Sequence, residues 1–205
     1  MTARLALTFA LTLSLCAALA ADAATIYDEA VSGDLSGSGL TPNSLSVAEG
    51  SNQIFGTTGR DAVTGVDRDY FTLTVPVGYE FVSLIELAGT TVVGGISFIA
   101  IQTGPQVTVP SNTPDATGLY GWTHYGPAAS PVDILPAMGI PIAGSTGFTP
   151  PIGAGAYAFW IQDTGLGSSS YGFDIVIAPV PEPGAAAGVL LGLVALGVAR
   201  ARRLG

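Results

Sequence analysis

The chain has 205 residues, enough for one folded domain, and its composition excludes several classes of protein. Six basic residues against fifteen acidic ones, with a net charge of -9, leave nothing to neutralise a row of phosphates, which excludes a nucleic-acid binder. One cysteine excludes a disulfide scaffold, and 28 glycines with 14 prolines disfavour a helical bundle. A hydrophobic fraction of 48% is too high for a chain that is disordered throughout.

Residues 1–23 have the three parts of a secretory signal peptide. Arg4 supplies a short positive start, residues 5–15 form an apolar stretch, and small residues follow. Ala18-Leu19-Ala20 and Ala21-Asp22-Ala23 are both suitable cleavage sites for signal peptidase. The alternative, a retained transmembrane anchor, needs a longer apolar stretch. We therefore expect this segment to form a signal helix that is removed during export.

The C-terminal segment, residues 179–205, carries three parts in a fixed order. The tetrapeptide Val180, Pro181, Glu182 and Pro183 precedes residues 184–199, which contain only Gly, Ala, Val and Leu, and Arg200, Arg202 and Arg203 follow. As a helix, the apolar run spans about 24 Å, which is workable for a transmembrane helix when the flanking arginines reach the interface. The arginines place that end in the cytoplasm and the main body outside.

This order of parts resembles the PEP-CTERM sorting signal of Gram-negative bacteria that make extracellular polysaccharide, over residues 180–205. The resemblance implies that an exosortase, a membrane-embedded enzyme with a cysteine nucleophile, recognises Pro181-Glu182-Pro183 and cleaves nearby. The protein is then held only transiently in the inner membrane before it reaches the cell surface or the extracellular matrix. An ordinary membrane anchor with a Pro-Glu-Pro linker, and without a sortase step, is the alternative.

The body between the two ends, residues 24–178, has the length of one domain and a net charge of -11, from thirteen acidic residues against Arg60 and Arg68. Apolar residues alternate or cluster in eight short runs: 26–31, 45–49, 53–56, 71–75, 81–87, 96–101, 156–162 and 171–177. No part of the body offers twelve residues of helical spacing without Gly or Pro. The pattern predicts an all-β fold, a single antiparallel β-sandwich of the jelly-roll kind with about eight strands.

Residues 102–155 differ from the rest of the body, because nine of these 54 residues are proline and nine are glycine. This composition predicts long connections with short edge strands at 106–109 and 140–143. Long ordered loops carry function more often than strands do.

A second resemblance concerns the fold of the body. The segment Asp67-Arg68-Asp69-Tyr70-Phe71, the turn Val75-Pro76-Val77-Gly78 and the later strand Gly155-Ala156-Tyr157 occur in that order. Together they resemble the pre-peptidase C-terminal domains of secreted bacterial enzymes, over about residues 50–178. The resemblance implies a jelly-roll-like sandwich and no activity.

The sequence offers few residues of the types that enzymes use for catalysis. His124 is the only histidine, and no Gly-x-Ser-x-Gly motif is present for a nucleophilic serine. One histidine, without a cysteine after export, does not make a zinc site. Glu80 and Glu86 on one predicted strand are about 20 Å apart, too far for paired carboxylates in glycoside hydrolysis. We expect a protein that is not an enzyme, and a polysaccharide-active enzyme is the alternative.

Calcium is the ion that the sequence favours, and no other cofactor is expected. Asp61, Asp67 and Asp69 lie within nine residues beside the start of a predicted strand, and Ca²⁺ prefers such oxygen ligands. Strand alternation puts Asp67 and Asp69 on one face. The alternative is a solvated acidic turn, with Arg60 and Arg68 as neighbours.

Four residues of the proline- and glycine-rich region form a candidate glycan site: Tyr120, Trp122, His124 and Tyr125. Flat rings stack on sugar faces, and the imidazole supplies hydrogen bonds. The alternative is that the rings cover the sheet core. The predicted function is that of an exported, non-catalytic surface or matrix protein with a structural or adhesive role. Its expected partners are signal peptidase, the exosortase, the inner membrane and extracellular polysaccharide. The alternative is a carbohydrate-binding or polysaccharide-active secreted protein.

Overall fold

The computed structural model describes residues 23–94 and 97–182. The expected signal peptide therefore lies almost wholly outside the described residues, and so do Pro183, the apolar run 184–199 and the three C-terminal arginines. Within the described ranges, none of the helices has the length and apolar character needed to cross a membrane.

The described chain is mostly β, as the sequence predicts. The elements are β1 (Ala24–Asp28), α1 (Glu29–Ser32), β2 (Asn43–Ser44), β3 (Gly50–Asp61), β4 (Gly65–Val75), β5 (Tyr79–Glu86), β6 (Phe98–Thr103), β7 (Gly121–Thr123), β8 (Val132–Asp133), α2 (Leu135–Met138), β9 (Gly155–Gln162) and β10 (Gly167–Pro179). Both helices have only four residues, which agrees with the density of glycine and proline.

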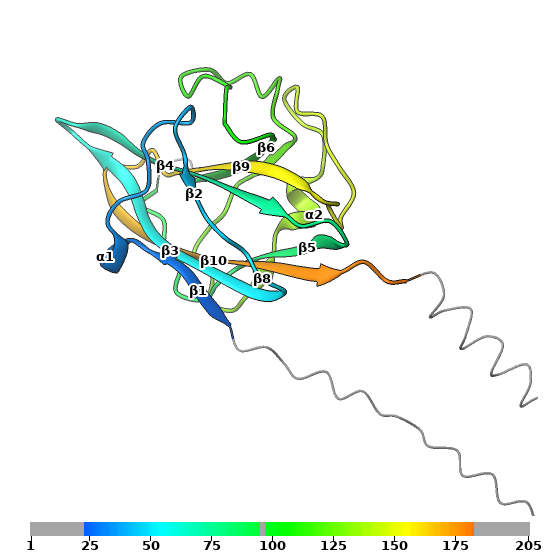
Figure 1. The fold of residues 1–205 in the computed structure, drawn as a ribbon. Helices are drawn as coiled ribbons and strands as arrows, with labels where there is room; N and C mark the ends of the chain where they lie inside the picture. The colour runs from blue at the N-terminus through cyan, green and yellow to red at the C-terminus, as the bar shows by residue number, and fades with distance from the viewer. Residues whose placement is uncertain (1–22, 95–96, 183–205) are drawn as a thin grey trace, which may run out of the picture.

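The strands form one curled sheet in the order β7-β6-β9-β4-β3-β10-β5-β8, with antiparallel neighbours throughout this order (Figure 1). The short strands β1 and β2 add parallel pairs to β3 and β4. The sheet continues from one half to the other only at the β3–β4 hairpin, where Gly59–Asp61 pairs with Gly65–Asp67. Beyond this hairpin the two halves separate and enclose a common core.

The hairpin turn is explained by its own residues. Asp61 Oδ1 accepts hydrogen bonds from the backbone amides of Val63 and Thr64, at 2.7 and 3.0 Å. Gly65 follows with φ +93°, a conformation that side-chain-bearing residues avoid. A side-chain acceptor at the start of a turn and a glycine at its end fix the reversal between β3 and β4.

The main core lies between the two halves of the sheet. Phe159 of β9 stacks on Phe71 of β4, with ring centroids 4.7 Å apart, and meets Phe81 of β5 edge-on at 6.2 Å. All three rings are at most 1% exposed. Each such buried side chain contributes about 1.5–3 kcal/mol to stability. Strand alternation explains the pattern, because Phe71, Leu73 and Val75 all face this core.

A second apolar cluster, which we call the outer cluster, covers the outer face of β4, β6 and β9. Tyr70 and Trp160 project from the sheet, and Val107 and Leu119 of the long connection close over them. The connection therefore forms a third layer. Its buried side chains help to explain why it is ordered although its strands, β7 and β8, have only three and two residues.

Three predicted strands are wrong. Residues 106–109 and 140–143 form no strand; in the first segment, Val107 enters the outer cluster and its amide bonds Gly39 O. Residues 45–49 also form none, since the Asn52 side chain bonds both the amide and the carbonyl of Ala48 in place of a partner strand. Strands β7 and β8, with only three and two residues, form instead.

Both ends of the described body lie at one end of β3. Ala24 of β1 pairs with Asn52 on one side, and Ile175 of β10 pairs with the same residue on the other. The β3–β4 hairpin is at the opposite end of β3, about 27 Å away at strand rise. The chain therefore enters and leaves the folded body at the end that lies opposite the hairpin.

Candidate functional site

Two pockets of the described structure contain candidate site residues: a pocket lined by aromatic rings and an acidic groove at the β3–β4 hairpin. The first has a volume of about 310 Å³ and lies on the outer face of β6, β7 and β9. We call it the aromatic pocket and define it by Phe98, Trp122, His124, Trp160 and Asp115. Small-ligand sites occupy about 300–1,000 Å³, so this pocket falls at the low end of that range.

Ring contacts join the apolar wall of the aromatic pocket into one unit. Phe98 meets Trp160 edge-on at 4.8 Å and lies at a tilt to Trp122 at 5.5 Å. Trp122 in turn meets His124 edge-on at 5.2 Å. Trp160 is 4% exposed, whereas Phe98 and Trp122 are half-buried. Trp160 thus anchors the wall to the sheet, and the other two rings offer surface to a ligand.

Backbone carbonyls hold the two polar rings of the aromatic pocket in place. His124 Nδ1 lies 2.6 Å from the carbonyl oxygen of Ser97. Because a carbonyl can only accept, Nδ1 carries the hydrogen, and in the neutral ring Nε2 is an acceptor. Trp122 Nε1 donates to the carbonyl of Ile142 at 3.2 Å. A fixed indole and a fixed imidazole acceptor are the components of a site for hydroxyl-rich ligands.

The other two residues of the predicted glycan site lie elsewhere. Tyr120 packs on Phe148 at 4.7 Å, against the main core. Tyr125 is 5% exposed, and its hydroxyl contacts Thr58 Oγ1 at 3.1 Å. The structure therefore brings together Trp122 and His124 but turns Tyr120 and Tyr125 to the core, because the chain changes face on either side of the three-residue strand β7.

Sequence reasoning missed Phe98 and Trp160 as walls of the aromatic pocket. They come from β6 and β9, which are 57 residues apart at their first residues and adjacent only in the folded sheet. The apolar run 156–162 did contain a signal, since alternation sends Phe159 to the main core and Trp160 to the opposite face.

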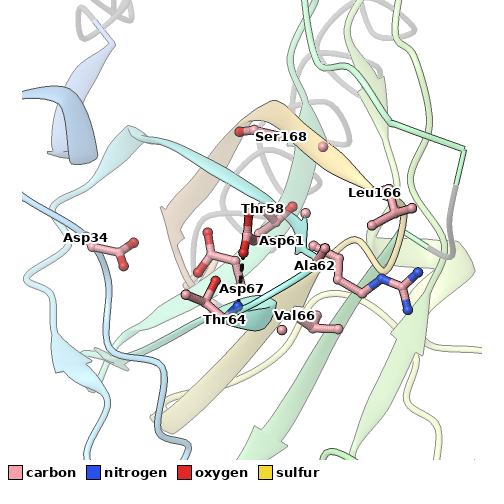
Figure 2. A pocket seen from close by; sticks show the side chains of 13 residues that line it. Asp34, Thr58, Asp61, Ala62, Thr64, Val66, Asp67, Leu166 and Ser168 are labelled. Carbon is pink, nitrogen blue, oxygen red and sulfur yellow. Dashed lines mark hydrogen bonds between the residues drawn. The ribbon is translucent and has the colours of Figure 1, made fainter.

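The acidic groove, which we call the hairpin groove, has a volume of about 760 Å³ at the tip of β3 and β4 (Figure 2). Asp61 and Asp67 line it from the hairpin, and Asp34 approaches from a separate N-terminal loop. Burial raises the pKa of Asp67, and the nearby Asp34 charge adds to the increase. The hydrogen bonds from the hairpin turn lower the pKa of the exposed Asp61.

The three aspartates predicted to bind calcium are divided between two places. Asp61 and Asp67 line the hairpin groove, whereas the side chain of Asp69 is fully buried. Asp69 instead lies beside Glu29 and Asp34, which sequence reasoning missed. Their positions 35 to 40 residues earlier in the chain carry no spacing signal; the pairing of Ser36 with Tyr70 and of β2 with β4 brings the segments together.

The walls of both sites combine segments that are distant in the sequence, including the N-terminal loop, the hairpin and the long connection. What each site can bind is therefore inferred from the arrangement of these residues in the folded structure. Comparison of the chain with protein-family models, with curated proteins and with solved structures finds no match.

Proposed function

We propose that this chain is an exported, non-catalytic adhesive protein of the cell surface or the extracellular matrix, built on a jelly-roll-like β-sandwich and sorted at Pro181-Glu182-Pro183 by an exosortase. Its body binds polysaccharide through the aromatic pocket. The observation that carries this proposal is the fixed pair of Trp122 and His124 on a wall of further aromatic rings.

The chemistry of the aromatic pocket suits sugars. A pyranose ring has an apolar face, which packs on an indole, and a rim of hydroxyls, which need donors and acceptors. Trp122 supplies the half-buried ring face, His124 Nε2 an acceptor, and Asp115 a carboxylate at the rim. The Asp115 carboxylate accepts the amide of Thr117 at 2.9 Å, which holds it ready to accept from a sugar hydroxyl as well.

The acids of this pocket favour binding over hydrolysis. Glycoside hydrolysis in its common form needs two carboxyl groups about 5–9.5 Å apart across the scissile bond. Asp115 is the only carboxylic acid among the residues that line the aromatic pocket. Hydrogen bonds from Thr117 lower the pKa of Asp115, the opposite of what a general acid requires.

The position of the pocket fits a protein attached through its C-terminal end. Phe98 pairs with Gln162, and Gln162 with Arg68, so the pocket lies near the hairpin end of the sheet. The C-terminal strand β10 leaves from the other end, where Pro179 pairs with Tyr79. Along β4, Arg68 and Val75 are about 23 Å apart at strand rise. Attachment after β10 therefore presents the pocket away from the attachment point.

The proposal is tested by glycan binding. The full-length chain, purified in detergent, is applied to an array of bacterial polysaccharides and oligosaccharides, together with Trp122→Ala and a control, Tyr79→Ala. Tyr79 is a half-buried aromatic residue at the other end of the sheet. We expect Trp122→Ala to weaken binding at least tenfold, about 1.4 kcal/mol, and Tyr79→Ala to bind like the parent. A parent chain that binds no glycan, or equal binding by Trp122→Ala, contradicts the proposal.

A further inference from the structure

Three carboxylates from two distant parts of the chain meet at the hairpin end of the main core. Glu29 lies in α1, Asp34 in the loop that follows it, and Asp69 in β4. One oxygen atom from each carboxylate lies within 4.8 Å of the other two. We call these residues the acidic cluster. It is distinct from the aromatic pocket, which lies on the outer face of the sheet.

Asp69 has the least usual environment of the three. Alternation along β4 puts it on the same face as Phe71 and Leu73, so its carboxylate faces inward at the end of the core. Its side chain is fully buried, and neither carboxylate oxygen has a hydrogen-bond partner. A buried carboxylate without a donor or a counter-charge costs several kcal/mol, so this position calls for a positive partner.

The Tyr171 hydroxyl is a second buried polar group that faces the acidic cluster without a hydrogen-bond partner. Tyr171 is 2% exposed, and the charges that act on its hydroxyl most strongly are those of Asp69 and Glu29. The hydroxyl is near enough to lower the pKa of Asp69 but does not meet hydrogen-bond geometry with it. A neutral oxygen thus joins the three carboxylates around one small volume.

Glu29 is held as a metal ligand is usually held. Its Oε1 accepts the amide of Leu35 at 3.1 Å, and its Oε2 accepts the amide of Thr57 at 2.8 Å. Oε2 also accepts a long bond from the Thr57 hydroxyl at 3.4 Å, whereas Oε1 keeps a lone pair for another partner. Upstream, Asp28 caps α1 by accepting the amide of Ala30 at 2.9 Å, which sets the position of Glu29. Such outer hydrogen bonds fix the direction of a ligating carboxylate.

Within residues 23–94 and 97–182, no basic side chain neutralises the cluster. The charges that act on Asp69 are those of Glu29, Asp67 and Asp34, all acidic. Arg68, next in sequence to Asp69, points its guanidinium elsewhere, since Nε donates to Gln162 at 3.0 Å. Burial, followed by the Glu29 charge, raises the pKa of Asp69 to about 9. A cation is therefore the missing element of the electrostatics.

We propose that Glu29, Asp34 and Asp69 bind one calcium ion, with the Tyr171 hydroxyl beside it. Ca²⁺ takes six to eight oxygen ligands at about 2.3–2.6 Å, so oxygens on opposite sides of one ion are about 4.6–5.2 Å apart. The three oxygens lie within 4.8 Å of one another, which is close enough for all of them to contact one such ion. Mg²⁺ binds at about 2.0–2.1 Å and retains several waters, which suits a smaller and wetter site. The donor set contains only oxygen, which disfavours zinc.

The ion can reach the site from solvent, and its binding would connect two segments of the chain. Asp34 is exposed and also lines the hairpin groove, so the groove connects the cluster with solvent. Once bound, the ion links α1 and its following loop to β4, which otherwise share the backbone bond from Tyr70 N to Ser36 O at 2.9 Å. Extracellular calcium modules bind at about 10⁻⁴–10⁻³ M, so the N-terminal segment becomes fixed where calcium is abundant.

The test compares metal binding and thermal unfolding of the full-length chain in detergent, after removal of metal. Ca²⁺ or Mg²⁺ is titrated by calorimetry into the parent, Asp69→Asn and Asp61→Asn. The last variant is the matched control, because it removes one acid of the hairpin groove outside the cluster. We expect one calcium ion per chain and a rise in Tm for the parent and Asp61→Asn, and at least a tenfold loss of affinity for Asp69→Asn.

A second variant guards against misfolding of the first. Glu29→Gln keeps the shape of this half-buried side chain and one of its two hydrogen bonds from backbone amides, and it should also bind calcium at least tenfold more weakly. Three results overturn the proposal: no calcium binding by the parent, equal binding of magnesium, or unchanged calcium binding in folded Asp69→Asn and Glu29→Gln. The first of these means that a proton shared between Asp69 and Glu29, and not an ion, neutralises the cluster.

Discussion

Gly56 and Tyr171 face each other across β3 and β10, and the Tyr171 hydroxyl occupies the space where any other residue at position 56 would place its Cβ. The same Cβ position is 2.8 Å from Cδ of Glu29. The absence of a side chain at position 56 thus lets Tyr171 and Glu29 approach the acidic cluster together. Gly56 is part of the site although it contributes no ligand atom.

Gly56→Ala should therefore damage both stability and metal binding. The added methyl must displace the Tyr171 ring or the Glu29 carboxylate, and overpacking of this kind costs about 1–3 kcal/mol. We expect a lower urea midpoint and at least a tenfold weaker calcium affinity. The control is Gly153→Ala, since a Cβ at position 153 meets nothing within 4 Å. If Gly56→Ala unfolds and binds calcium like this control, the glycine does not shape the site.

In metal-free buffer, the free energy of unfolding should fall as the pH rises from about 4 to 9. The pKa of Asp69 is raised to about 9 in the folded chain, chiefly by burial, from an ordinary value of 3.8. The folded state therefore holds a proton that the unfolded state releases, so the contribution of Asp69 to stability is fully present below pH 4 and is lost towards pH 9. The change is on the order of several kcal/mol.

The groups that face Asp69 act in the same direction on this pH dependence. Glu29 from α1 and Asp67 from β4 also have raised pKa values, and the charges of both raise that of Asp69, as does Asp34 from the intervening loop. Burial raises the pKa of Tyr171 from β10 further above its ordinary range, so it stays neutral. Asp69→Asn should flatten the profile measured by urea unfolding at pH 5 and pH 8. A parent profile without slope in metal-free buffer contradicts the assignment.

The class of the fold could be predicted from the sequence because its core strands follow simple alternation. Phe71, Leu73 and Val75 repeat every second residue, and all three face the core. The strand at 45–49 failed because one side chain, Asn52, satisfies the backbone of Ala48. The spacing of apolar residues does not reveal such local hydrogen bonds from a side chain to the backbone. Very short strands such as β8 also lie below what a periodic pattern can detect.

The candidate sites were less predictable than the fold, because their residues meet through pairing of distant strands. Trp122 and His124 can be recognised from the sequence because they are neighbours in a loop rich in aromatic residues. Trp160 cannot, because the sequence shows it only as one residue of an apolar strand, and its place on the outer face is seen only in the folded structure. The sequence singles out Asp69 as a candidate calcium ligand because it lies two residues after Asp67. Its real neighbours, Glu29 and Asp34, depend on the path of the N-terminal loop over β4.

The stacked rings of the main core predict the largest loss of stability from a single truncation. Phe159→Ala removes the ring that contacts both Phe71 and Phe81 across the two halves of the sheet. Truncation of a buried phenylalanine costs about 3–5 kcal/mol, which a shift of the urea midpoint at constant m-value measures. Val77→Ala is the control, at a position 93% exposed, and should change stability by less than about 0.5 kcal/mol. Equal midpoints for the two variants would mean that the halves are not held together by these rings.

The last prediction concerns processing at the C-terminal end. The amide of Val180 donates to Gly78 O at 2.8 Å, and the exposed Pro181 and Glu182 follow this last backbone bond. A protease can therefore reach the motif while β10 keeps its pairing on both sides. In a bacterium with an exosortase, we expect the exported parent to lack Arg200, Arg202 and Arg203 by intact mass, and Glu182→Ala to retain them.

Glu80→Ala is the matched control for processing, because Glu80 is an acid of β5 paired with Ala178, close to the motif but outside it. It should be processed like the parent. The processed body should also unfold at the same temperature as the unprocessed chain, since no described backbone bond to the body is made beyond Val180. A parent protein that keeps its full C-terminal mass, in cells that process another substrate of the same enzyme, excludes the sorting step.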